Sequence, residues 1–275
     1  RICNMQPNYA SVIELARKAG AAILEIYGRG EFTVVEKQDD SPLTLADITS
    51  NNILMEGLKE ILDIPVISEE TDIPEQEERA QWPMFWLIDP LDGTKEFIDR
   101  NGEFTVNIAL IEQGEPVFGL IYVPVSDQCY YGGDGKAFLK VGHEPASLLK
   151  SISPNKRIRE EDCIRLYASR RHASDQLVHL CNRLEEKISQ VQLVAMGSSL
   201  KLALLAAGDG DVYPRYGNVS EWDIAAGHAI LRCVGGDILS KQYEGIHYGR
   251  KPSMVVPGFF AVAYVDFDWR PLLLT

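Results

Sequence analysis

The chain has 275 residues, enough for one large domain or two modest ones. Apolar residues make up 45% of it, which supports a sizeable core and argues against global disorder. The formal net charge of -13 argues against binding to a nucleic acid polymer or to anionic lipid, because both would be repelled. For the same reason, a polyanionic substrate requires a cation or local basic groups.

The five cysteines are scattered and form no C-x-x-C pair, so we expect reduced thiols with structural roles in a cytoplasmic protein. The first residues lack the pattern of a signal peptide. No apolar run approaches the ~20 residues that span a bilayer. The histidines lack the spacing of zinc ligands.

In the first part of the chain, hydrophobic periodicity predicts two helices followed by a largely antiparallel sheet. Helical spacing covers residues 10–27 and 44–62. Apolar runs bounded by Gly, Pro and Asp predict strands over 32–35, 65–67, 104–111, 117–123, 129–131 and 137–141. The acidic and polar segment 71–81 is predicted to be a surface loop.

In the second part, strands and helices alternate, which is typical of an α/β layer. The expected elements are strands over 164–168, 191–195 and 211–213, near Ile238 and over 259–263, and helices over 174–186, 198–207 and 222–234. The polar segment 142–161 is the best candidate for a boundary. It divides the chain into an N-terminal half, 1–147, and a C-terminal half, 148–275. The pattern of residues 268–275 predicts no structure.

Acidic residues follow several of the expected strands. The apolar run 84–88 stops at Asp89, and Asp92 comes three positions later. Pro90 fixes its own φ and restricts the residue before it, so the two carboxylates have little conformational freedom. Three further acids stand at the end of a strand or the start of a helix: Glu69, Glu70 and Asp223.

Acids at the ends of neighbouring strands point into the same crevice, where their carboxylates repel one another. A divalent cation relieves this repulsion, and oxygen-only ligands indicate Mg²⁺ rather than Zn²⁺. Gly93 and Thr94 add backbone N–H groups that suit an anion. Acids for a metal beside amides for an anion indicate a phosphate ester, whose hydrolysis two metal ions ~3.5–4 Å apart can promote.

Each acid also has a purely structural interpretation. Asp92-Gly93 is a common turn signal, and Asp223 fits the start of a helix as a cap. Thr44 to Asp47 fits a capping box, in which Asp47 serves the helix start. The residues alone leave the role of Asp47 open between this box and catalysis.

Taken together, these motifs resemble those of the inositol monophosphatase superfamily of Mg²⁺-dependent, lithium-sensitive phosphatases. The matching parts are Asp47, Glu69-Glu70, DPLDGT from Asp89 to Thr94, and WDIAA from Trp222 to Ala226. They are in order and span most of the chain. The resemblance implies an α/β fold, an α-β-α-β-α sandwich, with the active site between the halves.

The resemblance also implies the roles of these residues, with two or three Mg²⁺ per site. One ion would be bound by Glu69, Asp89 and the backbone carbonyl of Leu91, and a second by Asp89, Asp92 and Asp223. The residues that would contact the scissile phosphate or substrate are Glu69, Leu91, Asp92, Gly93, Thr94 and Asp223. Thr94, oriented by Asp47, would help to deprotonate the attacking water, with Glu69 close by. Either acid of the Glu69-Glu70 pair fits the metal.

Within the superfamily, the chain most resembles the bacterial 3'(2'),5'-bisphosphate nucleotidases. The motifs are DPLDGTKEFIDRNGEFTVNIALI, ASRRHA, GSSLK, YPRYG and WDIAAGHAI. They imply that His172, Ser198, Lys201 and Arg215 bind the nucleotide and its 5'-phosphate. The expected reaction is hydrolysis of adenosine 3',5'-bisphosphate to AMP and phosphate, which recycles a by-product of sulfate assimilation. 3'-Phosphoadenylyl sulfate is a second expected substrate.

Other interpretations remain at this stage. Ser198 fits an ordinary helix cap, and a lone His172 or Arg215 fits a surface position. The whole protein fits an inositol monophosphatase or a sugar bisphosphatase, and also a non-catalytic metal and nucleotide sensor. The resemblance allows weak peripheral contact with the cytoplasmic face of the inner membrane, which the net charge disfavours. The sequence indicates no oligomeric state.

Overall fold

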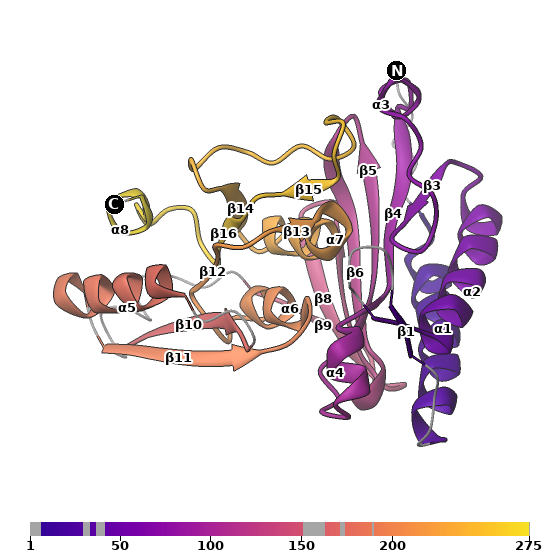
Figure 1. Cartoon of the computed structure of the whole chain (residues 1–275), viewed down its shortest axis with the longest axis horizontal. Helices are drawn as coiled ribbons and strands as arrows, with labels where there is room; N and C mark the ends of the chain where they lie inside the picture. The colour runs from indigo at the N-terminus through magenta and orange to yellow at the C-terminus, as the bar shows by residue number, and fades with distance from the viewer. Residues whose placement is uncertain are drawn as a thin grey trace.

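The computed structural model describes residues 7–29, 34–36, 42–150, 163–170, 174–188 and 190–274. Over these ranges the chain forms five layers that alternate between helices and sheets (Figure 1). This arrangement confirms the predicted α/β fold and its α-β-α-β-α sandwich. Parts of three predictions lie outside the described residues: His172, Cys3, and positions 32 and 33 of the first expected strand. No helix in the described ranges is long and apolar enough to cross a membrane.

The larger sheet comes from the N-terminal half and has seven strands. In spatial order they are β3 (Val66–Ser68), β4 (Met84–Asp92), β5 (Thr105–Glu112), β6 (Glu115–Val123), β7 (Gln128–Gly133), β8 (Lys136–Val141) and β9 (Ser147–Leu148). β3 pairs with β4 in parallel, and the other neighbours are antiparallel. Short turns join consecutive strands into hairpins: Gln113-Gly114 connects β5 to β6, and Asp134-Gly135 connects β7 to β8.

Strand β4 explains why its sequence is a continuous apolar run. Alternate side chains of a strand point to opposite faces. Trp86 and Ile88 are buried on the face that packs against the first two helices, and Phe85 and Leu87 on the opposite face. The sheet is therefore covered on both sides, which requires apolar residues at every position.

The smaller sheet comes from the C-terminal half. Its spatial order is β11 (Gln190–Met196), β10 (Cys163–Ser169), β12 (Val212–Arg215), β16 (Phe259–Val262) and β14 (Asp237–Ser240). β10 is parallel to both of its neighbours, whereas β16 is antiparallel to β12 and β14. Two small two-stranded antiparallel sheets complete the described strands: β1 (Val34–Glu36) with β2 (Pro42–Thr44), and β13 (Val219–Ser220) with β15 (Val255–Val256).

Helices form the three other layers (Figure 1). α1 (Tyr9–Gly28) and α2 (Leu45–Ile61) cover one face of the larger sheet. α6 (Leu200–Ala206) and α7 (Glu221–Arg232) lie between the two sheets. α5 (Asp175–Lys187) covers the outer face of the smaller sheet, where the short helix α8 (Arg270–Leu273) contacts it. The fully buried Trp269 precedes α8, so the C-terminal segment that predicted no structure packs into the core.

Three predictions about local structure were wrong. The loop expected over 71–81 contains a helical turn, α3 (Gln76–Arg79). Its Arg79 is buried, and the guanidinium donates hydrogen bonds to the backbone carbonyls of Lys251 and Pro252. β4 does not stop where its apolar run stops. It continues to Asp92 through a register shift after Asp89. The helix expected from Ser198 begins at Leu200, because Ser198 has a φ of 46°.

The division of the chain into halves 1–147 and 148–275 stays a prediction. β9 still pairs with β8 of the larger sheet, and residues 151–162, which make up most of the expected boundary, lie outside the described residues. One core cluster joins residues of both halves, because α7 packs against strands of the larger sheet.

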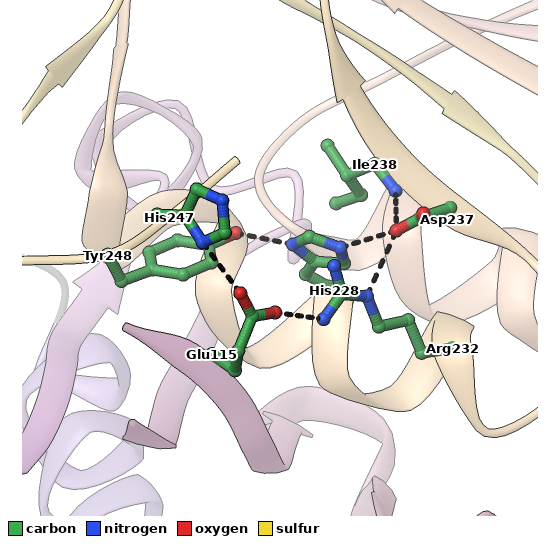
Figure 2. Close-up of polar contacts among 7 residues, drawn as sticks. All are labelled: Glu115, His228, Arg232, Asp237, Ile238, His247 and Tyr248. Carbon is green, nitrogen blue, oxygen red and sulfur yellow. Dashed lines mark hydrogen bonds and ion pairs between the residues drawn. The ribbon is translucent and has the colours of Figure 1, made fainter. Parts of the chain in front are cut away.

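A network of polar side chains holds α7 between the two sheets (Figure 2). His228, fully buried on α7, contacts the Tyr248 hydroxyl through Nδ1 (2.8 Å) and Asp237 of β14 through Nε2 (2.6 Å). Arg232 bridges Asp237 and Glu115, which begins β6. Burial lowers the pKa of His228, so its ring is neutral at pH 7. Nε2 then carries the proton that it donates to Asp237, and Nδ1 accepts from Tyr248.

Candidate active site

Three of the predicted acids meet in one place. Glu69 follows β3, Asp89 lies within β4, and Asp223 lies in the first turn of α7. Each offers one carboxylate oxygen, and these oxygens lie within 4.8 Å of one another. Glu69, Asp89 and Asp223 are far apart in the sequence, and the fold brings them together. Glu70 is not part of this group.

The acids raise one another's pKa values. Burial and the neighbouring carboxylates of Glu69 and Asp92 raise the pKa of Asp89 well above its usual range. Burial, Asp92 and Glu69 do the same for Asp223. Burial raises the pKa of Asp92 to about 6, although Lys201 and a backbone N–H oppose the shift. Such a cluster is costly when all of its members are ionised.

The donor set fits a hard divalent cation. All the converging atoms are carboxylate oxygens, the ligands that Mg²⁺ prefers. Asp89 is 1% exposed, so it lacks the solvent that would otherwise screen its charge. A cation at this position would offset both the burial and the mutual repulsion that raise these pKa values. Which carboxylate contacts which ion stays a prediction.

Asp47 forms the capping box and also contacts Thr94, so its predicted catalytic role is compatible with its structural one. Its Oδ2 accepts hydrogen bonds from the Thr44 backbone N–H (2.7 Å) and hydroxyl (2.6 Å), which completes the capping box of α2. Its Oδ1 accepts a hydrogen bond of 3.0 Å from the Thr94 hydroxyl. Asp47 is 1% exposed, and burial raises its pKa. The helix start therefore holds one oxygen of Asp47 in position for Thr94.

The turn after β4 places Thr94 beside the acids. Gly93 has a backbone φ of 92°, which residues other than glycine rarely adopt. It leads into the short helix α4 (Thr94–Ile98). The Leu91 N–H donates to Asp89 (3.0 Å), and the Ser50 hydroxyl donates to the Pro90 carbonyl (2.7 Å). These bonds fix the segment between the two aspartates.

A pocket of about 250 Å³ lies beside this turn. It brings predicted metal ligands together with predicted nucleotide-binding residues from the C-terminal half. The predicted site residues that line it are Asp92, Gly93, Thr94, Ser198, Lys201, Arg215 and Asp223. His172 lies outside the described residues, so its place relative to this pocket stays a prediction.

Within the described part of the chain, three cationic residues line this pocket: Lys95, Lys201 and Arg215. Lys201 is 3% exposed, and its ammonium group donates to the carbonyls of Met196 (3.1 Å) and Ser198 (2.5 Å). Burial lowers its pKa to about 8. These hydrogen bonds use two of its three N–H groups, and the ammonium nitrogen lies 5.1 Å from the centre of the Tyr213 ring. Arg215 donates to the Asn218 carbonyl, and among the described residues its buried Nε has no hydrogen-bond partner. The side chains of Lys201 and Arg215 suit an anionic group in the pocket.

Sequence reasoning missed the polar contacts that join the two halves at this pocket. The Ser199 N–H donates to Asp92 (2.5 Å). The Ser199 hydroxyl donates to the side-chain oxygen Oδ1 of Asn107 (2.7 Å) and lies 2.8 Å from the Thr105 hydroxyl. Asn107 also donates to Asp92 (3.3 Å). A polar Asn and Thr within the otherwise apolar run of β5 were the only signal in the sequence.

Comparison with known proteins gives a consistent result. The model of the inositol monophosphatase family matches residues 4–258. Among curated proteins, the chain is 45% identical over 255 residues to the 3'(2'),5'-bisphosphate nucleotidase CysQ of Salmonella typhimurium, covering 92% of this chain and 98% of that protein.

Solved structures give the same result. The crystal structure of CysQ from Bacteroides thetaiotaomicron, described as a bacterial member of the inositol monophosphatase family, matches with a TM-score of 0.80 and 36% identity. The match covers 94% of this chain and 97% of that one. An IMPase from Thermotoga maritima matches with a TM-score of 0.70 at 22% identity, covering 92% and 90% of the two chains, and supports the fold alone.

Proposed function

The chain belongs to the inositol monophosphatase family, and from this we propose that it is a Mg²⁺-dependent phosphatase that hydrolyses adenosine 3',5'-bisphosphate to AMP and phosphate. The observation that carries the proposal is the pocket in which Asp92, Thr94 and Asp223 adjoin Lys201 and Arg215, since Asp223 also belongs to the acid cluster. An acid cluster alone suits any phosphate ester. The added cations favour a substrate with a second phosphate.

Glu69, Asp89, Asp92 and Asp223, with the carbonyl of Leu91, would bind two or three Mg²⁺. Bound Mg²⁺ supplies the positive charge that stabilises the phosphoryl oxygens and increases the acidity of water. The protein contributes a rigid and partly buried arrangement of ligands, because hydrogen bonds of the Asp89 and Ser50 side chains with backbone groups fix the turn from Asp89 to Gly93.

Thr94 and Asp47 would move the proton of the attacking water. The Thr94 hydroxyl donates to Asp47, so its oxygen lone pairs remain free to accept a proton from water. As Thr94 accepts that proton, it passes its own proton to Asp47. The raised pKa of Asp47 suits this step, because a more basic carboxylate accepts a proton more readily.

The C-terminal half would bind the remainder of the substrate. Lys201 and Arg215 would neutralise the 5'-phosphate, and Ser198 lines the same pocket from the loop before α6. 3'-Phosphoadenylyl sulfate has the same nucleotide and 3'-phosphate, so we include it as a second substrate. His172 would complete this set.

The direct test is phosphate release from adenosine 3',5'-bisphosphate and from inositol 1-phosphate, with Mg²⁺ and with EDTA. We expect Mg²⁺-dependent release and a clear preference for the nucleotide. Lys201→Ala should raise KM for the nucleotide about tenfold or more, because a buried charged contact is lost.

The rival functions give different results in the same assay. A preference for inositol 1-phosphate would identify an inositol monophosphatase instead. Binding of the nucleotide without release of phosphate would identify a sensor. If Lys201→Ala and Arg215→Ala leave turnover of the nucleotide unchanged, the proposed substrate is wrong.

A further inference from the structure

Glu103 connects the N-terminal half to two loops of the C-terminal half. We propose that it is a positioning residue for the nucleotide, an inference that rests on the proposed function. One carboxylate oxygen accepts a hydrogen bond of 2.7 Å from the backbone N–H of Gly197. The other lies 2.5 Å from the guanidinium of Arg170. A single side chain therefore holds two separate segments.

Both segments lead directly to residues that are predicted to bind the nucleotide. Gly197 precedes Ser198 and lies four positions before Lys201. Arg170 directly follows β10, two positions before His172. The Arg170 N–H also donates to the Met196 carbonyl (3.3 Å), which ties the two loops to each other. Movement of Glu103 would therefore displace both loops at once.

Glu103 is itself held beside the turn that contacts the scissile phosphate. Its N–H donates to the Asn101 side chain (2.9 Å), and the next residue, Phe104, is fully buried. A Cβ atom on Gly93 would lie only 3.1 Å from the Glu103 carbonyl oxygen. The segment that carries Glu103 thus packs against the phosphate turn. It sets the distance between that turn and the nucleotide loops.

The loop that Glu103 anchors needs such support. Ser198 has a φ of 46°, a left-handed conformation that residues other than glycine seldom adopt and that the surrounding structure must stabilise. It is held on both sides, because Gly197 donates to Glu103 and Ser199 donates to Asp92. A Cβ atom on Gly197 would lie 2.4 Å from the Cγ atom of Glu96, so the loop is also seated directly on α4. Loss of one anchor would release Ser198 from this conformation.

Inhibition by the two reaction products tests this role. AMP contains the nucleotide and its 5'-phosphate, whereas inorganic phosphate occupies the scissile position only. In Glu103→Ala, we expect the inhibition constant of AMP and the KM of adenosine 3',5'-bisphosphate to rise about tenfold. The inhibition constant of inorganic phosphate and kcat should change by less than about threefold. A general structural defect would not separate the two products in this way.

Three further variants sharpen the test. Glu103→Gln keeps an oxygen for the Gly197 N–H and loses the ion pair, so its affinity for AMP should lie between those of the wild type and Glu103→Ala. Arg170→Ala removes the other partner of the ion pair, so it should raise the inhibition constant of AMP by about as much as Glu103→Gln does. Glu144→Ala changes an exposed glutamate in a turn of the N-terminal half and should leave both constants unchanged.

Two results would overturn the inference. The first is an inhibition constant of AMP that is the same in folded Glu103→Ala as in the wild type. If that variant does not fold, the same result in Arg170→Ala would count. The second is an equal loss of affinity for AMP and for phosphate. Failure of the proposed function would look different, because the wild type itself would then release no phosphate from the nucleotide.

Discussion

At the scale of single residues, Asp47 and Asp223 each cap the start of a helix and also contact other residues of the candidate site. Asp47 uses one oxygen for the cap of α2 and the other for Thr94. Asp223 accepts from the Ser220 N–H (2.7 Å) at the start of α7 while it faces Glu69 and Asp89. A capping motif in sequence therefore does not argue against a catalytic role, because a carboxylate has two oxygens.

The acid cluster predicts how Mg²⁺ binding depends on pH. The pKa values of Asp89, Asp92 and Asp223 are raised in the metal-free fold, so the folded state holds protons more tightly than the unfolded chain. Mg²⁺ must displace these protons. The rise in the unfolding midpoint that Mg²⁺ causes should therefore increase from pH 5.5 to pH 8. Thermal unfolding with and without Mg²⁺ measures it, and a rise that is independent of pH would contradict this electrostatic description.

Lys201 predicts a second pH dependence, in substrate binding. Burial lowers its pKa to about 8, so the ammonium group is charged at pH 7 and loses its proton above pH 8. The KM for adenosine 3',5'-bisphosphate should rise between pH 7.5 and 9.5. Lys201→Arg should remove most of this rise, because arginine stays protonated. An identical KM profile in both proteins would show that another group is responsible.

At the scale of elements, most helices and strands could be predicted because their apolar residues repeat with the period of the element. α3 could not, since the acidic composition around it indicates surface. The partners that bury Arg79 lie more than 170 positions later in the chain. The contacts around His228 were missed for the same reason. They join β6, α7, β14 and the loop before Gly249 (Figure 2).

The network around His228 predicts a large effect on stability. His228→Ala should lower the free energy of unfolding by about 2–4 kcal/mol, because it opens a cavity and leaves Tyr248 without its acceptor. His179→Ala, which changes an exposed histidine on α5, is the matched control and should have little effect. Urea denaturation measures both. A loss below about 0.5 kcal/mol for His228→Ala would show that the network does not stabilise α7.

The same histidine predicts a loss of stability in acid. Its pKa is lowered by burial, so the unfolded chain binds a proton near pH 6.5 that the folded chain resists. The stability that neutral His228 provides is complete above about pH 6.5 and declines below it. The difference between wild type and His228→Ala should therefore shrink from pH 7.5 to pH 5.5. Because the acid cluster is common to both proteins, its contribution cancels in this difference. A difference that stays constant over this range would contradict a neutral buried ring.

At the scale of the whole molecule, two sheets and the helices between them bring acids of the N-terminal half together with Asp223, Lys201 and Arg215 of the C-terminal half. The motifs could predict this convergence, because each stands at the end of a strand or the start of a helix. The contacts that set its geometry, such as Ser199 with Asp92 and Glu103 with Gly197, could not be predicted. They depend on how the two halves meet, and a local pattern does not encode that.

Phosphate release by Asp89→Asn tests most directly whether the converged acids carry the reaction. The substitution keeps the size of the side chain and removes one buried charge. With Mg²⁺ and adenosine 3',5'-bisphosphate, turnover should fall by at least about 10³-fold, since the metal contributes several kcal/mol to such reactions. Circular dichroism should be unchanged, and the unfolding midpoint in EDTA should not fall, because repulsion among the acids is relieved. Turnover within tenfold of wild type would contradict a metal-dependent reaction at this site.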